Sequence, residues 1–155
     1  MRLENAFEVP APAARAWELL LDVPRVVPCM PGAELTETVD ERTWKTTMTV
    51  KLGPVSMSFL TDVERELVDE ASRTVRLRAS GREAKGRGFA DATIESTVAE
   101  LDGGRAHVSI VTEMRLSGTV GQFGGPAVKA VASHLTKRFA ACLAATLDGG
   151  AGGSG

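Results

Sequence analysis

The stretch 44-WKTTMTVKLGPVSMSFLTDV-63 decides the fold class. Apolar and polar side chains alternate on both sides of Gly53-Pro54, and a period of two is typical of half-buried β-strands. The Gly-Pro pair predicts a turn between them. The stretch therefore predicts a hairpin with one inward face. That face carries Trp44, Thr46, Met48, Val50 and Leu52 before the turn, and Val55, Met57, Phe59, Thr61 and Val63 after it.

The same alternation extends to both sides of this hairpin. A first strand is predicted at 1–9, where Leu3, Ala6 and Val9 recur loosely. Short turns such as Asp102-Gly103-Gly104 join the later segments, so consecutive strands are expected to pair antiparallel. The further predicted strands are 33–39, 42–52, 55–68, 74–80, 88–101 and 107–116.

Three helices complete the pattern. A short amphipathic helix is predicted at 13–21, followed by a second short one at 23–27. A long apolar stripe from Val120 to Leu143 predicts a terminal helix of roughly 25 residues. The fold class is α+β: a curved antiparallel sheet of about seven strands around that helix. The domain is expected to span 1–148, with 149–155 a flexible Gly-rich tail, either a tether or the remnant of a truncation.

Composition narrows the functional classes. The 155 residues are 43% hydrophobic and 25% charged, with a formal net charge of −2. That balance predicts a soluble globular protein and gives no long-range attraction for nucleic acid. Cys29 and Cys142 lie far apart, and the sequence predicts two separate thiols that act as apolar fillers in a reducing cytoplasm. No apolar signal segment or membrane-spanning run is present, which favours a cytoplasmic location.

Four stretches resemble one known family. They are LENAFEVPAPAARAWELLLDVPRVVPCMPGAEL at 3–35, KLGPVSMSF at 51–59, GREAKGRGFADATI at 81–94 and SGTVGQFGGPAVKAVASHLTKRF at 117–139. In this order they resemble CoxG, a family of carbon monoxide dehydrogenase subunits, and the resemblance runs from about residue 2 to residue 147. It implies a helix-grip fold of the START and Bet v 1-like (SRPBCC) superfamily.

The resemblance also implies a function. Its members are accessory proteins of carbon monoxide dehydrogenase-type molybdenum hydroxylases, associated with bringing that enzyme to the inner face of the cell membrane. Membrane contact would come from a C-terminal extension beyond this chain. The expected ligand is an apolar small molecule, a menaquinone-like quinone above all, and no catalytic cofactor is expected.

Eleven inward residues form the predicted ligand pocket. They admit two interpretations: plain core packing, or the lining of a cavity in which flexible methionines adapt to an apolar ligand. Small or polar inward residues such as Ala79, Ala92 and Thr112 favour a cavity, because they fill little space. The predicted pocket residues are Trp44, Met48, Met57, Phe59, Leu77, Phe89, Met114, Leu116, Phe123, Val128 and Val131.

Two loops are candidate gates, and one turn is a candidate contact. Gly121, Gln122, Phe123 and Gly124 form either a mobile gate or a plain strand-to-helix connection. Pro28, Met30 and Pro31 form either the facing rim or a buried helix end. Arg82, Lys85 and Arg87 are either a solvated hairpin tip or a contact for a partner enzyme or lipid headgroups.

Catalysis is not indicated. His107 and His134 have no metal-spaced partner, and no catalytic or metal site is predicted. The polar inward side chains are neutral hydroxyls, which are poor general bases. Three hypotheses result: a quinone carrier, a recruitment adaptor without ligand, and, more weakly, a cyclase-like enzyme. The inward hydroxyls belong to Thr46, Thr61, Ser96 and Thr112.

Overall fold

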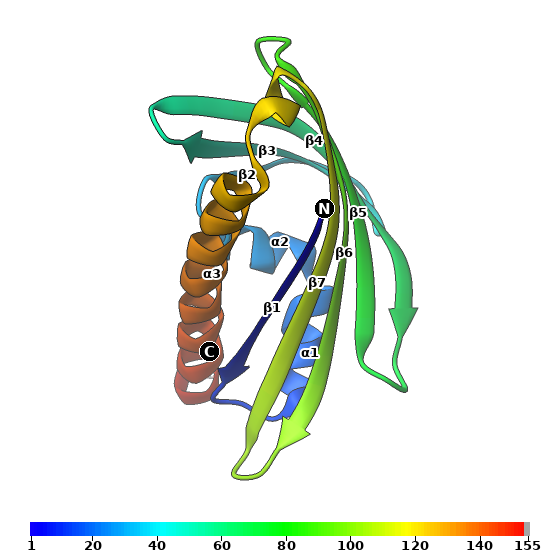
Figure 1. Ribbon diagram of the computed structural model, residues 1–155. Helices are drawn as coiled ribbons and strands as arrows, with labels where there is room; N and C mark the ends of the chain where they lie inside the picture. Colours follow the sequence, from blue (N-terminus) through cyan, green and yellow to red (C-terminus); the bar gives the residue numbers. More distant parts are fainter. Residues whose placement is uncertain (154–155) are drawn as a thin grey trace.

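A computed structural model describes the backbone of residues 1–153 and the side chains of residues 1–148. One antiparallel sheet of seven strands dominates it, in the order β1-β7-β6-β5-β4-β3-β2. Figure 1 shows the sheet curving around the long helix α3. The strands are β1 (Arg2–Val9), β2 (Ala33–Asp40), β3 (Thr43–Leu52), β4 (Val55–Asp69), β5 (Thr74–Glu83), β6 (Gly88–Leu101) and β7 (Arg105–Gly118).

The helices follow the first and last strands. The short elements α1 (Ala13–Leu21), α2 (Val23–Val26) and the 3-10 turn η1 (Val27–Cys29) connect β1 to β2. A second 3-10 turn, η2 (Thr119–Gln122), leads from β7 into α3 (Gly125–Gly153). The predicted α+β class and element order are confirmed. The predicted tail beginning at Gly149 lies outside the residues whose side chains are described.

The register of β1 differs from the sequence prediction. Leu3, Phe7 and Val9 pair with the concave-face residues Thr112, Val108 and Ala106 of β7. Ala6 is exposed on the other face, and Phe7 packs edge-on against Phe139 of α3. The loose spacing through Ala6 was therefore the wrong phase, because a strand alternates strictly and Phe7 takes the inward position.

Two separate hydrophobic clusters hold α3 to the sheet. The first lies at its C-terminal half, where Phe139, Leu143 and Leu147 pack with α1 and the ends of β1, β5, β6 and β7. The second lies near its start, where Val131 and the preceding Phe123 pack against buried residues of β3, β4 and η2. The buried members of the second cluster are Leu52, Met57, Phe59 and Val120.

A disulfide joins Cys29 of η1 to Cys142 of α3, with the two Cα atoms 5.3 Å apart. The prediction of two separate thiols is wrong. Sequence spacing could not reveal the pair, because 113 positions separate the cysteines and only the folded chain brings η1 against α3. The bond fixes α3 to the turn at the level of the first cluster.

Candidate ligand-binding site

The floor of the candidate site is the centre of the concave sheet face. Pairing across β4, β5 and β6 places Thr61, Gly81 and Ala90 in one row and Ala79 beside Ala92 in the next. These side chains are short, and even a methyl group at Gly81 would come within 2.8 Å of Thr61 Oγ1. The sheet is therefore thin where α3 passes over it.

The walls of the site are larger apolar side chains between the two clusters. Met48, Ile94, Met114 and Leu135 are half-buried and belong to neither cluster. We call these four residues and the floor the central belt. Side chains that pack fully in a core of this size are normally buried on all sides. Their partial exposure indicates that the belt is not filled by the protein's own side chains.

A groove of about 810 Å³ lies between β1 and the start of α3. It is lined mainly by apolar atoms of Met1–Asn5 and of the first turns of α3, from Gly125 to Ser133. Leu3 pairs with Thr112, and Thr112 pairs with Ile94 of the central belt, so the inner wall of the groove continues onto the belt. We call it the β1–α3 groove.

Polar groups are sparse in this groove. Asn5 is half-buried on the concave side, and Ser133 and Lys129 come from the helix. The β1 strand is at the sheet edge, so part of its backbone N–H and C=O groups face away from β7. Arg2 is engaged elsewhere, since its guanidinium pairs with Glu4 and Glu113 on the outer face. The groove suits an apolar molecule with few hydrogen-bonding groups.

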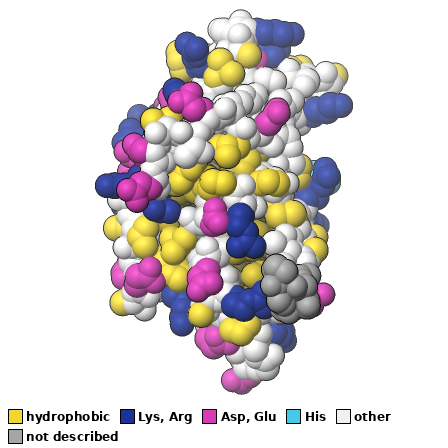
Figure 2. Space-filling model, turned by 180° about the vertical axis from the view of Figure 1, so that it is seen from behind, with side chains coloured by type: hydrophobic (Ala, Val, Ile, Leu, Met, Phe, Trp, Pro, Cys, Tyr) yellow, Lys and Arg dark blue, Asp and Glu magenta, His cyan; other side chains and the backbone are white. Residues whose placement is uncertain are grey.

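Exposed apolar atoms are not confined to the groove. Figure 2 shows hydrophobic side chains gathered across the middle of the rear face, with charged side chains above and below them.

A second pocket of about 430 Å³ lies at the far end, between α1, α2 and the β2–β3 hairpin. Its centre is closed by Arg65, whose guanidinium lies 5.7 Å from the ring centre of Trp44. Arg65 also donates to the carbonyl oxygens of Leu21 at 2.9 Å and Glu41 at 3.2 Å. These bonds tie the end of α1 to the hairpin, so the arginine closes this end of the sheet.

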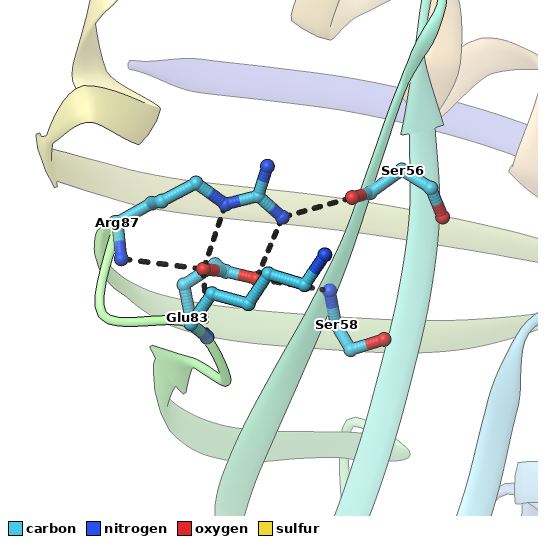
Figure 3. A network of polar contacts seen from close by, with 5 residues as sticks. Ser56, Ser58, Glu83 and Arg87 are labelled. Atoms are coloured by element: carbon cyan, nitrogen blue, oxygen red, sulfur yellow. Dashed lines mark hydrogen bonds and ion pairs between the residues drawn. The ribbon is translucent and has the colours of Figure 1, made fainter.

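Glu83 is the one buried carboxylate among the described residues. Its Oε1 accepts from Arg87 Nε and from the backbone N–H of Lys85, both at 2.9 Å, and its Oε2 accepts from Arg87 Nη2 at 3.0 Å. Figure 3 shows this cluster, in which Arg87 also donates to the carbonyl oxygen of Ser56. The hydrogen bonds from Arg87, with backbone donors added, lower the pKa of Glu83 from 4.5 to about 2.

That network changes the interpretation of the predicted basic turn. Arg87 is committed to Glu83, while Arg82 and Lys85 are exposed. The sequence analysis missed Glu83 because nothing in its neighbours indicates burial. Its alternation with Gly81 on β5 was the available signal.

The predicted pocket residues separate into groups. Met48 and Met114 lie in the central belt, and Trp44 lies beneath Arg65. Leu77 packs on the first cluster, and Val128 is buried on α3. The remaining inward residues belong to or pack on the second cluster: Met57, Phe59, Leu116, Phe123 and Val131.

Phe89 is a correction. It was predicted to face inward, but its side chain is 57% exposed on the convex face. The strand alternates, and its neighbour Ala90 packs inward on the second cluster, so Phe89 must point the other way.

The two predicted gate segments lie apart. Phe123 packs on the second cluster, while Met30 packs on the first, next to the disulfide. Gly121, Gln122 and Gly124 are exposed, as is Pro28, while Pro31 is half-buried. The β1–α3 groove begins at Gly125, directly after the first segment. Sequence reasoning missed the β1 side of this opening, because strand order cannot be derived from alternation alone.

The family model of CoxG, a carbon monoxide dehydrogenase subunit, matches residues 6–148. The chain belongs to the CoxG family. No curated protein sequence matches it. Membership makes this CoxG chain an accessory protein rather than the dehydrogenase itself.

Solved structures place this CoxG chain among START and Bet v 1-like folds. A conserved protein from Geobacillus kaustophilus has a TM-score of 0.85 at 16% identity, covering 97% of both chains. The Zhui aromatase/cyclase from Streptomyces sp. R1128 has a TM-score of 0.69 at 16% identity, covering 97% of this chain and 95% of its own. A START superfamily protein from Mycobacterium smegmatis has a TM-score of 0.62 at 16% identity, covering 95% and 97%. At this identity the likeness shows the helix-grip fold alone.

Two other kinds of site are missing from the described part of the chain. Among the residues that the structure describes, no group of three or more His, Cys, Asp or Glu side chains is placed to hold a metal ion. Within the same residues, no helix is both long and apolar enough to cross a bilayer.

Proposed function

We propose that this CoxG protein is a non-catalytic carrier that binds a quinone-like apolar molecule in the central belt. It takes the molecule up through the β1–α3 groove and presents it to a carbon monoxide dehydrogenase-type enzyme. The observation that carries the proposal is the belt itself. Half-buried apolar side chains lie there over a floor of short residues, between two packed clusters.

The size of the groove suits such a ligand. Its volume of about 810 Å³ lies within the roughly 300–1,000 Å³ range typical of small-molecule sites. Burying about 250 Å² of apolar ligand surface gains roughly 6 kcal/mol before the costs of association. A few hydrogen bonds are needed as well, and quinone carbonyls are acceptors. Asn5 and Thr112, which lie where the groove meets the belt, are the proposed donors.

The polar groups of the interior support carriage rather than catalysis. The buried carboxylate Glu83 is held ionised by Arg87 and by backbone donors, so it is not available to exchange a proton with a ligand near neutral pH. The buried hydroxyls of Thr46 and Ser96 and the half-buried one of Thr61 can orient a carbonyl but are weak bases. The likeness to an aromatase/cyclase keeps turnover of a polyketide as an outcome to be measured.

The test compares two tryptophan substitutions on β7. Met114→Trp fills the central belt, and Arg115→Trp adds the same ring at the next position, on the exposed face. Binding of a short-chain menaquinone is measured by titration calorimetry and native mass spectrometry. We expect Met114→Trp to weaken binding by about tenfold or more and Arg115→Trp to leave it unchanged.

Each contrary result has a defined meaning. If the wild-type protein binds no quinone at saturating concentration, the carrier proposal is wrong and a recruitment adaptor remains. Equal loss in both tryptophan variants would place the ligand outside the belt. Turnover of an aromatic polyketide would assign the belt to an enzyme.

A further inference from the structure

The convex face of the sheet carries an unusual row of side chains at the level of β4, β5 and β6. Leu60 of β4 pairs with Arg82 of β5, and Arg82 pairs with Phe89 of β6. Paired strands lie about 4.8 Å apart, so the three side chains form a line of roughly 10 Å. Leu60 is 44% exposed and Phe89 57% exposed, on the face turned away from α3 (Figure 1).

The charge of this row is also distinct. Arg82 makes no ion pair with any residue in the described part of the chain, unlike Lys45, Arg76 and Arg87 on the neighbouring strands. Lys85 is exposed at the adjoining hairpin, and the charge of Arg87 is neutralised by Glu83. The row is therefore locally positive, although the whole chain carries a formal charge of −2.

We propose that the Leu60–Arg82–Phe89 row is the docking surface for a protein partner, which offers a carboxylate next to an apolar recess. This inference rests on the proposed function, in that the partner is the carbon monoxide dehydrogenase-type enzyme. Arginine and aromatic side chains dominate the energetic centres of interfaces, and a lone arginine between two apolar groups selects an acidic counterpart.

The geometry favours a protein over a lipid surface. The two apolar side chains lie on a rigid, hydrogen-bonded sheet face, and the protruding hairpin tip beside them carries Lys85 rather than an apolar group. Membrane insertion uses apolar groups that project beyond the charged ones. A flat row with a central charge instead matches a complementary solid surface.

The location leaves the ligand route free. The row is on the convex face, whereas the β1–α3 groove opens at the sheet's edge beside α3. A partner bound at the row does not cover Met1–Asn5 or the first turns of α3, so the protein can bind the enzyme and exchange its ligand at the same time.

The experiment measures the affinity of the full chain for the purified molybdenum hydroxylase by biolayer interferometry. We expect Arg82→Glu and Phe89→Ser each to weaken binding by about tenfold or more. The effect of Arg82→Glu should shrink as salt is raised, because the pair is electrostatic. The matched controls are Arg78→Glu, four positions earlier on the same exposed face of β5, and Val39→Ser, an equally exposed apolar residue on β2. Both should bind as the wild type does.

Three results would overturn the docking proposal. One is the absence of any wild-type binding to the enzyme. A second is equal weakening by Arg82→Glu and Arg78→Glu, which would indicate only general charge attraction. The third is binding to phosphatidylcholine–phosphatidylglycerol vesicles that depends on Arg82 and Phe89 while enzyme binding does not.

The same variants separate this inference from the carrier function. Quinone binding is measured on each of them by native mass spectrometry. Retained quinone with unchanged enzyme affinity rejects the row alone, whereas row-dependent enzyme binding without any quinone rejects the carrier and keeps the docking surface.

Discussion

At the scale of single residues, Glu83 shows how much depends on a buried charge. Its carboxylate is 3% exposed and accepts from Arg87 and from three backbone N–H groups. A charge removed from water persists only when its lone pairs are satisfied. The cluster joins β4 to the β5–β6 turn directly beneath the second hydrophobic cluster.

The first prediction follows from the lowered pKa of Glu83. Below pH 4.5 the unfolded chain binds a proton at this residue that the folded chain does not, so stability falls with pH until about pH 2. Glu83→Gln should lower the free energy of unfolding at neutral pH and make its decline between pH 4.5 and 2 shallower. Urea unfolding at a series of pH values measures both effects.

The control for that prediction is Glu64→Gln, an exposed carboxylate on β4. It should keep the wild-type slope of stability against pH. If Glu83→Gln also keeps the wild-type slope, the carboxylate is not ionised in the folded protein as described.

A second residue prediction concerns two glycines of the β5–β6 turn. Gly88 has φ of +143°, and a Cβ there would lie 2.1 Å from the carbonyl oxygen of Ser117. Gly86 also has positive φ, +78°, but a Cβ there meets nothing within 4 Å. Gly86→Ala should cost about 1–2 kcal/mol, the price of the backbone conformation alone. Gly88→Ala should cost clearly more, as measured by chemical denaturation, because β6 must separate from β7.

At the scale of elements, alternation predicted the strands well and their faces less well. β6 was predicted with its observed bounds, because its period of two runs unbroken between two turns. Phe89 was nevertheless assigned inward, since its size suggested a core residue although its neighbours Ala90 and Ala92 already held that face. Large apolar residues are a weaker guide to orientation than the phase of the strand.

The disulfide between η1 and α3 supplies a prediction at this scale. Cross-linking residues 113 positions apart restricts the unfolded chain, an effect of about 2–4 kcal/mol in typical proteins. Cys142→Ser should lower the melting temperature, and dithiothreitol should lower the wild type to the same value without affecting the variant. A wild type that melts unchanged after complete reduction, verified by thiol labelling, would contradict this expectation.

At the scale of the whole molecule, the sheet and helix were predictable and the opening was not. The hairpin at 44–63, its neighbours and the terminal stripe determine a sheet wrapped on a helix. The opening depends on β1 lying at the sheet edge beside the start of α3, which follows from strand order. Local patterns carry no such long-range information, and the pairing of Cys29 with Cys142 was hidden for the same reason.

Ligand binding should stabilise the whole fold by mass action. At a free quinone concentration about one hundred times the Kd, the gain is about 2.7 kcal/mol. For a chain of 155 residues this raises Tm by roughly 5–10 °C. Differential scanning fluorimetry with short-chain menaquinone measures the shift, and Met114→Trp should abolish most of it. A shift of equal size in that variant would indicate binding elsewhere.

The attachment of α3 at Cys142 has a mechanical consequence. The helix is anchored near its far end by a covalent bond and the first cluster, while its start, about 25 Å away, rests on the smaller second cluster. Thermal motion will pivot the helix about this anchor, with the largest amplitude at Gly125 beside β1. Uptake and release then require only a slight swing of one end of a lever, and the rate of exchange is set independently of the stability of the fold.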